Sequence, residues 1–289
     1  MTQTSQPHRA YAKINLGLFV LRKRPDGYHD IATVFHRVDL FDEITFTESP
    51  TICVLSDEPA APGGDKNICS KAARLLQGAI GTTAGVAITL NKKIPVGAGL
   101  GGGSSDAATV IRELPSFWNA RVNTELLHRL AMQLGSDVPF FLLSGSAFAK
   151  GRGENLTPVN LDIPYAILLC YPNVHISTPW AYAHLKLTPV EAEVDVARIV
   201  ATGMTNPGWL RENLRNDFEP VVFNAYPEVS RVKEAMLHGG ATYASLSGSG
   251  SSVYGMFPDA ARATAVGHAF AVDGYRTFLT PPHFRAPVV

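Results

Sequence analysis

The sequence has few cysteines and no long hydrophobic run. Its three cysteines, at positions 53, 69 and 170, stand far apart among 289 residues, which argues against a disulfide framework and leaves no paired spacing for zinc. Apolar runs such as residues 165–171 are far too short to cross a bilayer, and the polar stretch 1–9 has no signal-peptide core. We therefore expect buried thiols, a cytoplasmic location and no membrane segment.

Net charge is also absent. Lys plus Arg equals Asp plus Glu, 25 each, so no overall field attracts nucleic acid or an anionic membrane, and local charge must hold any anionic ligand. With 46% hydrophobic and 17% charged residues the composition is globular, and the length favours two domains. Residues 156–164 contain two prolines and no helical pattern, so we expect domains at 1–157 and 158–289.

Two common phosphate-binding motifs are missing or out of context. The P-loop pattern G-x-x-x-x-G-K-[ST] occurs nowhere. Gly97, Gly99 and Gly102 fit the dinucleotide pattern G-x-G-x-x-G, but Pro95 interrupts the approach from the preceding strand. Glu125 follows these glycines by about twenty residues, where the dinucleotide fold has a ribose-binding acid at the end of a second strand. Here Glu125 falls in a helical pattern instead. A nicotinamide-dependent Rossmann enzyme is therefore an alternative that this context does not favour.

The most informative stretch is the glycine-rich segment 95–106. Its five glycines permit positive φ angles and leave main-chain N–H groups accessible to an anion. Apolar residues then repeat at helical spacing from 107 to 114, and Pro115 closes the pattern, so the segment opens a helix whose positive end favours a phosphate. Side chains at 104–106 can cap that helix. A plain connecting turn is the alternative, which the five glycines do not favour, because a connector needs only one or two. The residues expected to hold the phosphate here are Pro95, Val96, Gly97, Ala98, Gly99, Leu100, Gly101, Gly102, Gly103, Ser104 and Ser105.

Charged residues near this segment have two interpretations each. Residues 10–20 alternate as a strand, which puts Lys13 and Asn15 side by side on one face. A solvated lysine on an exposed face is the simpler interpretation of that pattern. Lys92 and Lys93, which precede the glycine-rich segment, can point to solvent or toward a phosphate.

Two further stretches carry candidate functional groups. Asp137 stands in the apolar stretch 136–141, where it can cap the helix that follows, with Pro139 in its first turn. It can also serve as a general base whose surroundings set its proton affinity. Tyr28 and His29 follow a Pro-Asp-Gly turn and place an aromatic face beside a hydrogen-bonding ring, which suits a nucleobase or ordinary strand packing.

The remaining stretches of the sequence predict both helices and strands. We expect helices at 68–80, with Asp65 or Asn67 as the cap, and at 124–134, 228–237 and 259–272. Strands are expected at 86–90, 146–150, 165–171 and 275–279, and over 31–46 with a polar turn at Asp42 and Glu43. Residues 216–219 fall in a helical tract, and 247–252 form a second small-residue loop between two strands.

Three stretches together resemble the motifs of the GHMP kinases, named for galactokinase, homoserine kinase, mevalonate kinase and phosphomevalonate kinase. They are residues 12–16, 95–108 and 246–252. Residues 26–29, the triple glycine before Ser104 and residues 135–141 narrow the resemblance to the branch that acts on a cytidine-diphosphate-linked methylerythritol. Members of that branch often carry Asn where this chain has Asp106.

The resemblance implies that ATP, with Mg²⁺, phosphorylates the 2-hydroxyl of the methylerythritol group in the non-mevalonate isoprenoid pathway. It implies that Asp137 orients or deprotonates this hydroxyl and that Lys13 pairs with Asp137 and faces the transferred charge. Asn67 is implied to contact the nucleoside of ATP. No second carboxylate suggests itself as a metal ligand, so we expect phosphates and water to hold the ion.

The same resemblance implies the substrate contacts. The cytosine is expected between the rings of Tyr28 and Tyr182, with His29 at its edge, and Asn15 and Lys92 are expected to contact polar groups of the substrate.

The resemblance also implies a two-domain α+β fold. Its N-terminal domain is expected to be similar to domain 2 of ribosomal protein S5, and its C-terminal domain to be ferredoxin-like. A small molecule is the only partner implied, and the chain is expected to be a monomer or homodimer. Another GHMP kinase and a non-catalytic nucleotide-binding regulatory protein are the alternatives.

Overall fold

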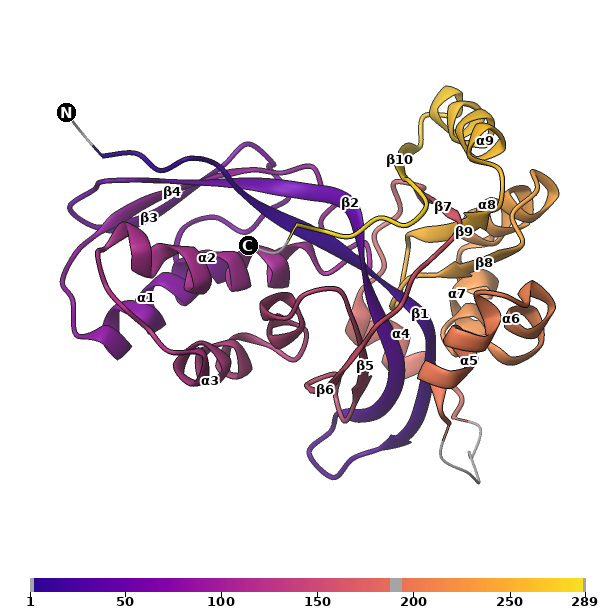
Figure 1. Ribbon diagram of the computed structural model, residues 1–289, viewed down its shortest axis with the longest axis horizontal. Helices are drawn as coiled ribbons and strands as arrows, with labels where there is room; N and C mark the ends of the chain where they lie inside the picture. Colours follow the sequence, from indigo (N-terminus) through magenta and orange to yellow (C-terminus); the bar gives the residue numbers. More distant parts are fainter. Residues whose placement is uncertain (1–2, 188–193, 288–289) are drawn as a thin grey trace. The chain divides into compact units, whose positions relative to one another are not determined.

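The chain divides into two compact units in the computed structural model, which describes residues 3–187 and 194–287 (Figure 1). Unit 1 contains the residues up to Ala12, Phe41–Val96 and Gly101–Ser144. Unit 2 contains Lys13–Leu40, Gly97–Leu100 and the chain from Gly145 onward. Each unit combines strands with helices, which confirms the two-domain α+β fold. The division at residue 157 stays a prediction.

Unit 1 has a small sheet with alternating buried residues. β4 (Val86–Asn91) is parallel to β3 (Ile52–Ser56) and antiparallel to the second half of β2 (His29–Thr47). Ile44 pairs with Leu90 in this register, and both are almost fully buried. The period of two in β4 therefore puts its apolar residues on one face, as expected from the sequence.

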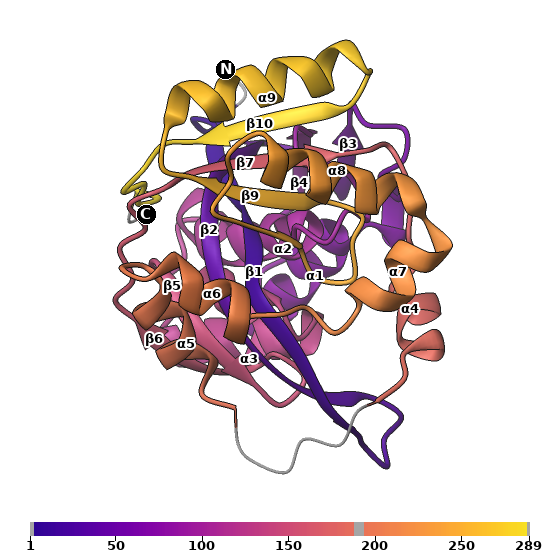
Figure 2. The ribbon, with the colours of Figure 1, turned by 90° about the vertical axis from the view of Figure 1, so that its right-hand side faces the viewer.

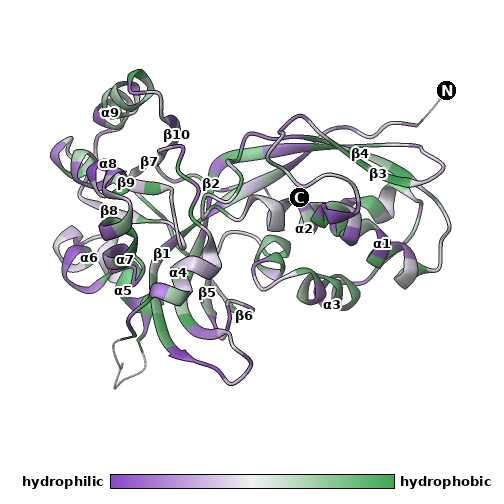
Figure 3. Cartoon of the chain, turned by 180° about the vertical axis from the view of Figure 1, so that it is seen from behind, coloured by the Kyte–Doolittle hydropathy of each residue, from purple (hydrophilic) through white to green (hydrophobic). Residues whose placement is uncertain are grey.

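Three helices and a short 3-10 helix pack around this sheet. α1 (Ile68–Ile80) contacts α2 (Gly102–Phe117), and α3 (Thr124–Leu134) contacts both, while η2 (Val138–Leu142) packs on α2 and α3. Asn67 caps α1 by accepting a hydrogen bond from the main-chain N–H of Cys69, which confirms one of the two expected caps. Hydrophobic and hydrophilic residues both occur along α1 and α3 (Figure 3).

β1 (His8–Lys23) and β2 are long strands that belong partly to each unit. β1 is buried over residues 10–20, so both of its faces are covered. Within unit 2, the first half of β2 pairs antiparallel with β5 (Ser146–Lys150), which pairs with β6 (Asn155–Val159).

The second sheet of unit 2 has the strand order β10–β7–β9–β8 and is antiparallel throughout. One helix, α8, precedes β8, and α9 connects β9 to β10, beside the sheet (Figure 2). This β-α-β-β-α-β order is that of a ferredoxin-like fold, as expected. The elements are β7 (Ala166–Tyr171), α8 (Pro227–His238), β8 (Tyr243–Leu246), β9 (Val253–Phe257), α9 (Ala260–Val272) and β10 (Arg276–Thr280).

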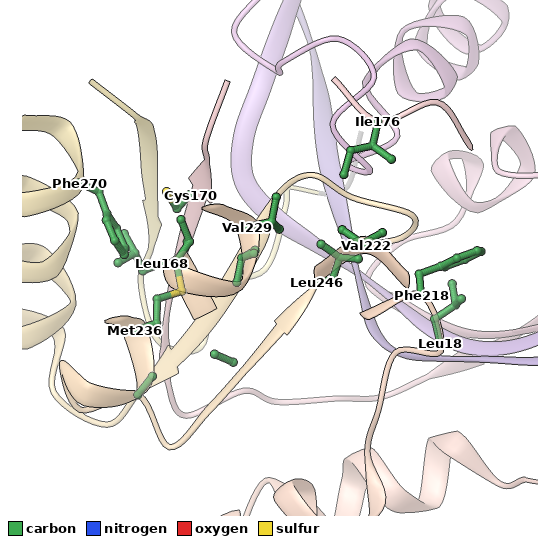
Figure 4. Close-up of a cluster of buried hydrophobic side chains, with 14 of the residues drawn as sticks. Leu18, Leu168, Cys170, Ile176, Phe218, Val222, Val229, Met236, Leu246 and Phe270 are labelled. Atoms are coloured by element: carbon green, nitrogen blue, oxygen red, sulfur yellow. The ribbon is translucent and has the colours of Figure 1, made fainter. Parts of the chain in front are cut away.

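One apolar cluster joins both helices to the same face of this sheet (Figure 4). Leu168 of β7 packs with Met236 of α8 and Phe270 of α9, and the cluster continues to Leu18 of β1 and to Phe218. The burial of so many aliphatic and aromatic groups stabilises unit 2. The shorter elements of the molecule are η1 (Gly64–Lys66), α4 (Thr178–His184), α5 (Val196–Gly203), α6 (Pro207–Asn213) and α7 (Glu219–Ala225).

Three local expectations are wrong. β2 runs through Asp42 without a turn, because the buried carboxylate of Asp42 has hydrogen-bond donors around it. Pro115 does not end α2, which continues to Phe117, since a proline in the last turn removes only one late hydrogen bond. Residues 216–218 are not helical, because the Asn216 side chain accepts the hydrogen bond of the Phe218 N–H and α7 begins only at Glu219. Among the described residues, no helix has the length and hydropathy of a membrane span.

Candidate active site

The glycine-rich segment adopts the conformation that its composition predicts. Gly97, Gly99 and Gly101 have φ values of 68°, 79° and 70°, in the left-handed region that glycine favours. α2 starts at Gly102, and no side chain caps it, so the expected capping by residues 104–106 is wrong. The N–H groups at the start of α2 therefore have no side-chain acceptor, which leaves the helix terminus suited to an anion.

Within unit 2, the second small-residue loop, residues 247–252, packs against residues 97–100. Ser247 Oγ donates to the carbonyl of Gly99 at 3.0 Å, and the Ser252 N–H donates to the carbonyl of Ala98 at 3.2 Å. A Cβ atom placed on Gly99 would lie 2.1 Å from the Ser247 carbonyl oxygen. Only glycine fits at position 99, because the two backbones are in direct contact.

Lys13 and Asn15 lie side by side on β1, as expected, but they are buried. The Lys13 ammonium donates to Asn15 Oδ1 at 2.6 Å, and Asn15 Nδ2 donates to Thr33 Oγ1 at 3.1 Å. The Lys13 N–H donates to the carbonyl of Leu100 at 2.9 Å, which ties β1 to the glycine-rich segment. The interpretation of Lys13 as an exposed, solvated side chain is wrong, since it is only 4% exposed.

Unit 1 contains a buried ion cluster of Lys92, Asp42 and Asp106. The Lys92 ammonium lies 2.6 Å from the Asp106 carboxylate and also donates to Asp42. Asp42 accepts the N–H groups of Lys93 and Ile94 as well, at 2.6 and 2.8 Å. Burial, together with the neighbouring Asp42, raises the pKa of Asp106 to about 7. Burial also raises the pKa of the nearby Cys69 thiol, so this thiol stays protonated at neutral pH.

Sequence reasoning missed Asp42, although a signal for it exists. Asp42 continues the inward-facing series of Leu40, Ile44 and Phe46 on β2, so an acid occupies an apolar face. Such a carboxylate requires a buried partner. The expected substrate contact of Lys92 stays a prediction, and two carboxylates already hold its ammonium.

Asp137 and Asn67 also lie in unit 1. Asp137 is half-buried at the N-cap position of η2, with no capping hydrogen bond from its side chain, so the capping interpretation is wrong. The Asn67 amide caps α1 and donates to the carbonyl of Pro62 at 2.8 Å. A contact of Asn67 with a nucleoside stays a prediction.

Two of the three aromatic side chains expected at the base, those of His29 and Tyr182, are in contact within unit 2. Tyr28 is 56% exposed, and the Arg152 guanidinium lies 4.9 Å from its ring centre. The rings of His29 and Tyr182 are stacked, with centroids 4.7 Å apart and planes at 21°. One face of the Tyr182 ring is therefore covered by His29. Burial, with a smaller effect of Lys23, lowers the pKa of His29, which favours the neutral ring.

Two more residues contact the loops of unit 2. The ring of His175 lies against Gly97, since a Cβ atom on Gly97 would be 2.6 Å from His175 Cε1. Asn216 donates to the carbonyls of Leu246 and Gly248. The sequence alone gives no signal for either contact, because both link distant parts of the chain. Among the described residues, no three His, Cys, Asp or Glu side chains gather as a metal site.

Two family models match separate stretches of the chain. The family "GHMP kinases N terminal domain" matches residues 67–145, and "GHMP kinases C terminal" matches residues 200–275. A protein of Chlorobium limicola named 4-diphosphocytidyl-2-C-methyl-D-erythritol kinase is 45% identical over 278 residues, 96% of each chain. One with the same name from Chlorobium phaeovibrioides is also 45% identical, over 279 residues and 96% of each chain.

A solved structure agrees with these relatives. The crystal structure of a 4-(cytidine 5'-diphospho)-2C-methyl-D-erythritol kinase is 33% identical, with a TM-score of 0.80. The match covers 95% of this chain and 98% of that one.

Proposed function

Because the chain belongs to the GHMP kinase family and, within it, to the 4-diphosphocytidyl-2-C-methyl-D-erythritol kinases, we propose that it phosphorylates 4-diphosphocytidyl-2-C-methyl-D-erythritol, which is called the cytidyl alcohol below. The γ-phosphoryl group of ATP passes to the 2-hydroxyl of the methylerythritol group, which gives the 2-phosphate and ADP in the non-mevalonate pathway to isoprenoids. The observation that carries the proposal is 45% identity over 96% of the chain to relatives of that name. A nicotinamide-dependent Rossmann enzyme is no longer supported, because both family matches are to kinases.

The glycine-rich segment holds the triphosphate in this proposal. Its three positive-φ glycines carry no Cβ that would keep an anion from the backbone, and the uncapped start of α2 adds N–H groups and a positive dipole end. Phosphoryl transfer leaves the protein little covalent work, so positioning and neutralisation of charge dominate the catalysis. The side chains of Ala98 and Leu100 are buried, which leaves the backbone as the surface of this segment that meets the nucleotide.

Asp137 and Lys13 carry the catalytic roles. Asp137 orients the 2-hydroxyl or accepts its proton, and Lys13 keeps Asp137 ionised and offsets the charge that moves. Both assignments rest on the sequence resemblance. The burial of Lys13 supports its role, since an ammonium with little solvent around it acts strongly on nearby charges.

The cytidyl substrate is recognised by aromatic and amide groups. Tyr28 offers an exposed ring for stacking, and the neutral His29 ring can both donate and accept a hydrogen bond at the base edge. Tyr182 is the second ring against the base in this proposal, and its ring also stacks on His29 and packs edge-to-face with Phe218. Asn15 and Lys92 contact polar groups of the substrate, and Asn67 contacts the nucleoside of ATP.

Magnesium accompanies ATP in the proposal. Phosphate oxygens and water supply most of the ligands of the ion, because Mg²⁺ keeps several waters and binds substrate phosphates. We further propose a cytoplasmic enzyme, a monomer or homodimer, with no nucleic-acid or membrane partner.

The release of ADP, measured with one alcohol at a time, tests the proposal. The purified chain with Mg-ATP should release ADP with the cytidyl alcohol and not with homoserine or mevalonate. Turnover of homoserine or mevalonate without turnover of the cytidyl alcohol would move the chain to a sister kinase. ATP binding without turnover of any alcohol would favour a regulatory protein.

A further inference from the structure

Asn216 is a buried amide in unit 2 that makes three of the four hydrogen bonds available to its side chain. It is 2% exposed. Its Nδ2 donates to the carbonyl of Leu246 at 2.9 Å and to that of Gly248 at 2.8 Å, while its Oδ1 accepts the Phe218 N–H at 2.9 Å. Only a carboxamide of this length offers two donors and an acceptor in that arrangement.

The segment that carries Asn216 is fixed on β1. The Leu18 N–H donates to the carbonyl of Arg215 at 2.8 Å, and the Asp217 N–H donates back to the carbonyl of Leu18 at 2.9 Å. The Asp217 carboxylate accepts the N–H of Val20 at 2.8 Å. Asn216 therefore projects from a support that is held on both sides, and it can transmit the position of β1 to the groups it contacts.

The groups that Asn216 holds belong to the loop 247–252 and its entry. This loop is in turn bonded to the glycine-rich segment, through Ser247 Oγ on the Gly99 carbonyl and the Ser252 N–H on the Ala98 carbonyl. A Cβ atom on Gly248 would lie 3.2 Å from the Gly99 carbonyl oxygen, so the two backbones touch at this point too. A shift of the 247–252 loop must move residues 98 and 99.

We propose that Asn216 is a positioning residue for ATP: it fixes the loop 247–252, which sets the direction of the amides in residues 97–100. The inference deepens the proposed function and rests on it. Misplacement of a reacting group by about 1 Å can cost 10²-fold in rate, so an anchor that touches no ligand can still control catalysis. Thr178 supports the same loop at its tip, where its Oγ1 lies 2.9 Å from Ser249 Oγ.

Asn216→Ala tests the proposal, with Asn213→Ala as a matched control. Asn213 also lies in unit 2 and donates to one carbonyl, that of Trp209 at 3.0 Å, but it has no bond to the loop. For Asn216→Ala we expect the Kd for ATP, measured by titration calorimetry on the full chain, to rise about 10-fold. We expect kcat to fall about 10- to 100-fold while the KM for the cytidyl alcohol changes less than 2-fold. Asn213→Ala should leave all three values unchanged.

Ser247→Ala provides the second variant in case Asn216→Ala does not fold, as judged by circular dichroism. It removes only the hydroxyl that donates to Gly99, and we expect a 3- to 10-fold rise in the Kd for ATP with the same substrate selectivity. Wild-type values of kcat and of the Kd for ATP in a folded Asn216→Ala would overturn the proposal, as would equal weakening of both substrates. If Asn216→Ala does not fold, a wild-type Kd for ATP in Ser247→Ala would overturn it. ATP binding separates this result from the proposed function, since it does not depend on which alcohol is phosphorylated.

Discussion

Lys92 and Asp106 form an ion pair of 2.6 Å inside unit 1, with side-chain exposures of 5% and 3%. Asp42 is a second carboxylate on the same ammonium, so the cluster holds two acids and one base. One Asp106 oxygen, Oδ1, is buried without a hydrogen-bond partner. Burial of Asp106, and then the second carboxylate on the same ammonium, make protonation of Asp106 favourable near neutral pH.

The first prediction concerns Asp106→Asn and stability. The pKa of Asp106 is about 7 in the folded chain, against 3.8 for the ordinary side chain, so between these values the folded state binds a proton that the unfolded state has lost. This contribution to stability is present at low pH and is lost as the pH rises toward 7. Between pH 5 and 8 the free energy of unfolding of the wild type should therefore fall by on the order of 2 kcal/mol relative to that of the variant, since one pKa unit equals about 1.4 kcal/mol.

Urea unfolding of both proteins at pH 5, 6, 7 and 8 measures this difference. The control Asp273→Asn removes an exposed carboxylate after α9 and should leave the difference from wild type constant. If the free energy of unfolding of Asp106→Asn also differs from that of the wild type by the same amount at every pH, the raised pKa of Asp106 is contradicted.

The second prediction concerns the contact between the two loops of unit 2. In Gly99→Ala the new Cβ would meet the Ser247 carbonyl at 2.1 Å, on a residue with φ of 79°. We expect the backbones to move apart and the Kd for ATP to rise more than 10-fold. Gly145→Ala is a matched control, because Gly145 has the same φ but nothing within 4 Å of an added Cβ. If both variants lose the same ATP affinity, the effect comes from backbone strain alone and not from the contact between Gly99 and Ser247.

The sequence predicted most of the elements but not the contacts between them. The helix at 124–134 and the cap Asn67 follow from local rules, namely a periodic apolar face and an amide before the first turn. The burial of Asp42 has a signal in the sequence, but the groups around Asp42 and the contact of Lys13 with the Phe35 ring could not be predicted, because other parts of the chain supply them. Asn216 was expected in a helix for the same reason: its local pattern is helical, and distant carbonyls decide its conformation.

The third prediction concerns the proposed base. Asp137→Asn removes the charge but keeps the shape of the side chain, and we expect kcat to fall by about 10²–10⁴. ATP affinity should change little, since the triphosphate is held by the glycine-rich segment. Steady-state kinetics with a parallel ATP titration separates the two quantities. Near-normal turnover in this variant would remove Asp137 from the chemistry.

The fourth prediction concerns the aromatic site for the base. Tyr28→Ala should raise the KM for the cytidyl alcohol by the equivalent of about 1–3 kcal/mol, the value of a stacking contact, with little effect on the KM for ATP. Tyr28→Phe keeps the ring and should behave as wild type. Tyr28 is exposed, so neither variant should lower the melting temperature appreciably. If the alanine variant keeps the wild-type KM, Tyr28 does not stack on the base.

Phosphorus NMR of the reaction product tests the central claim most directly, because it shows which oxygen receives the phosphoryl group. With Mg-ATP and the cytidyl alcohol, we predict one new phosphate monoester signal that appears in step with ADP and shows no three-bond coupling to a proton, because carbon 2 of the methylerythritol group carries the methyl group and no hydrogen. A monoester on any other hydroxyl, or ADP without a new monoester, would contradict the assignment of this chain as a kinase of the 2-hydroxyl.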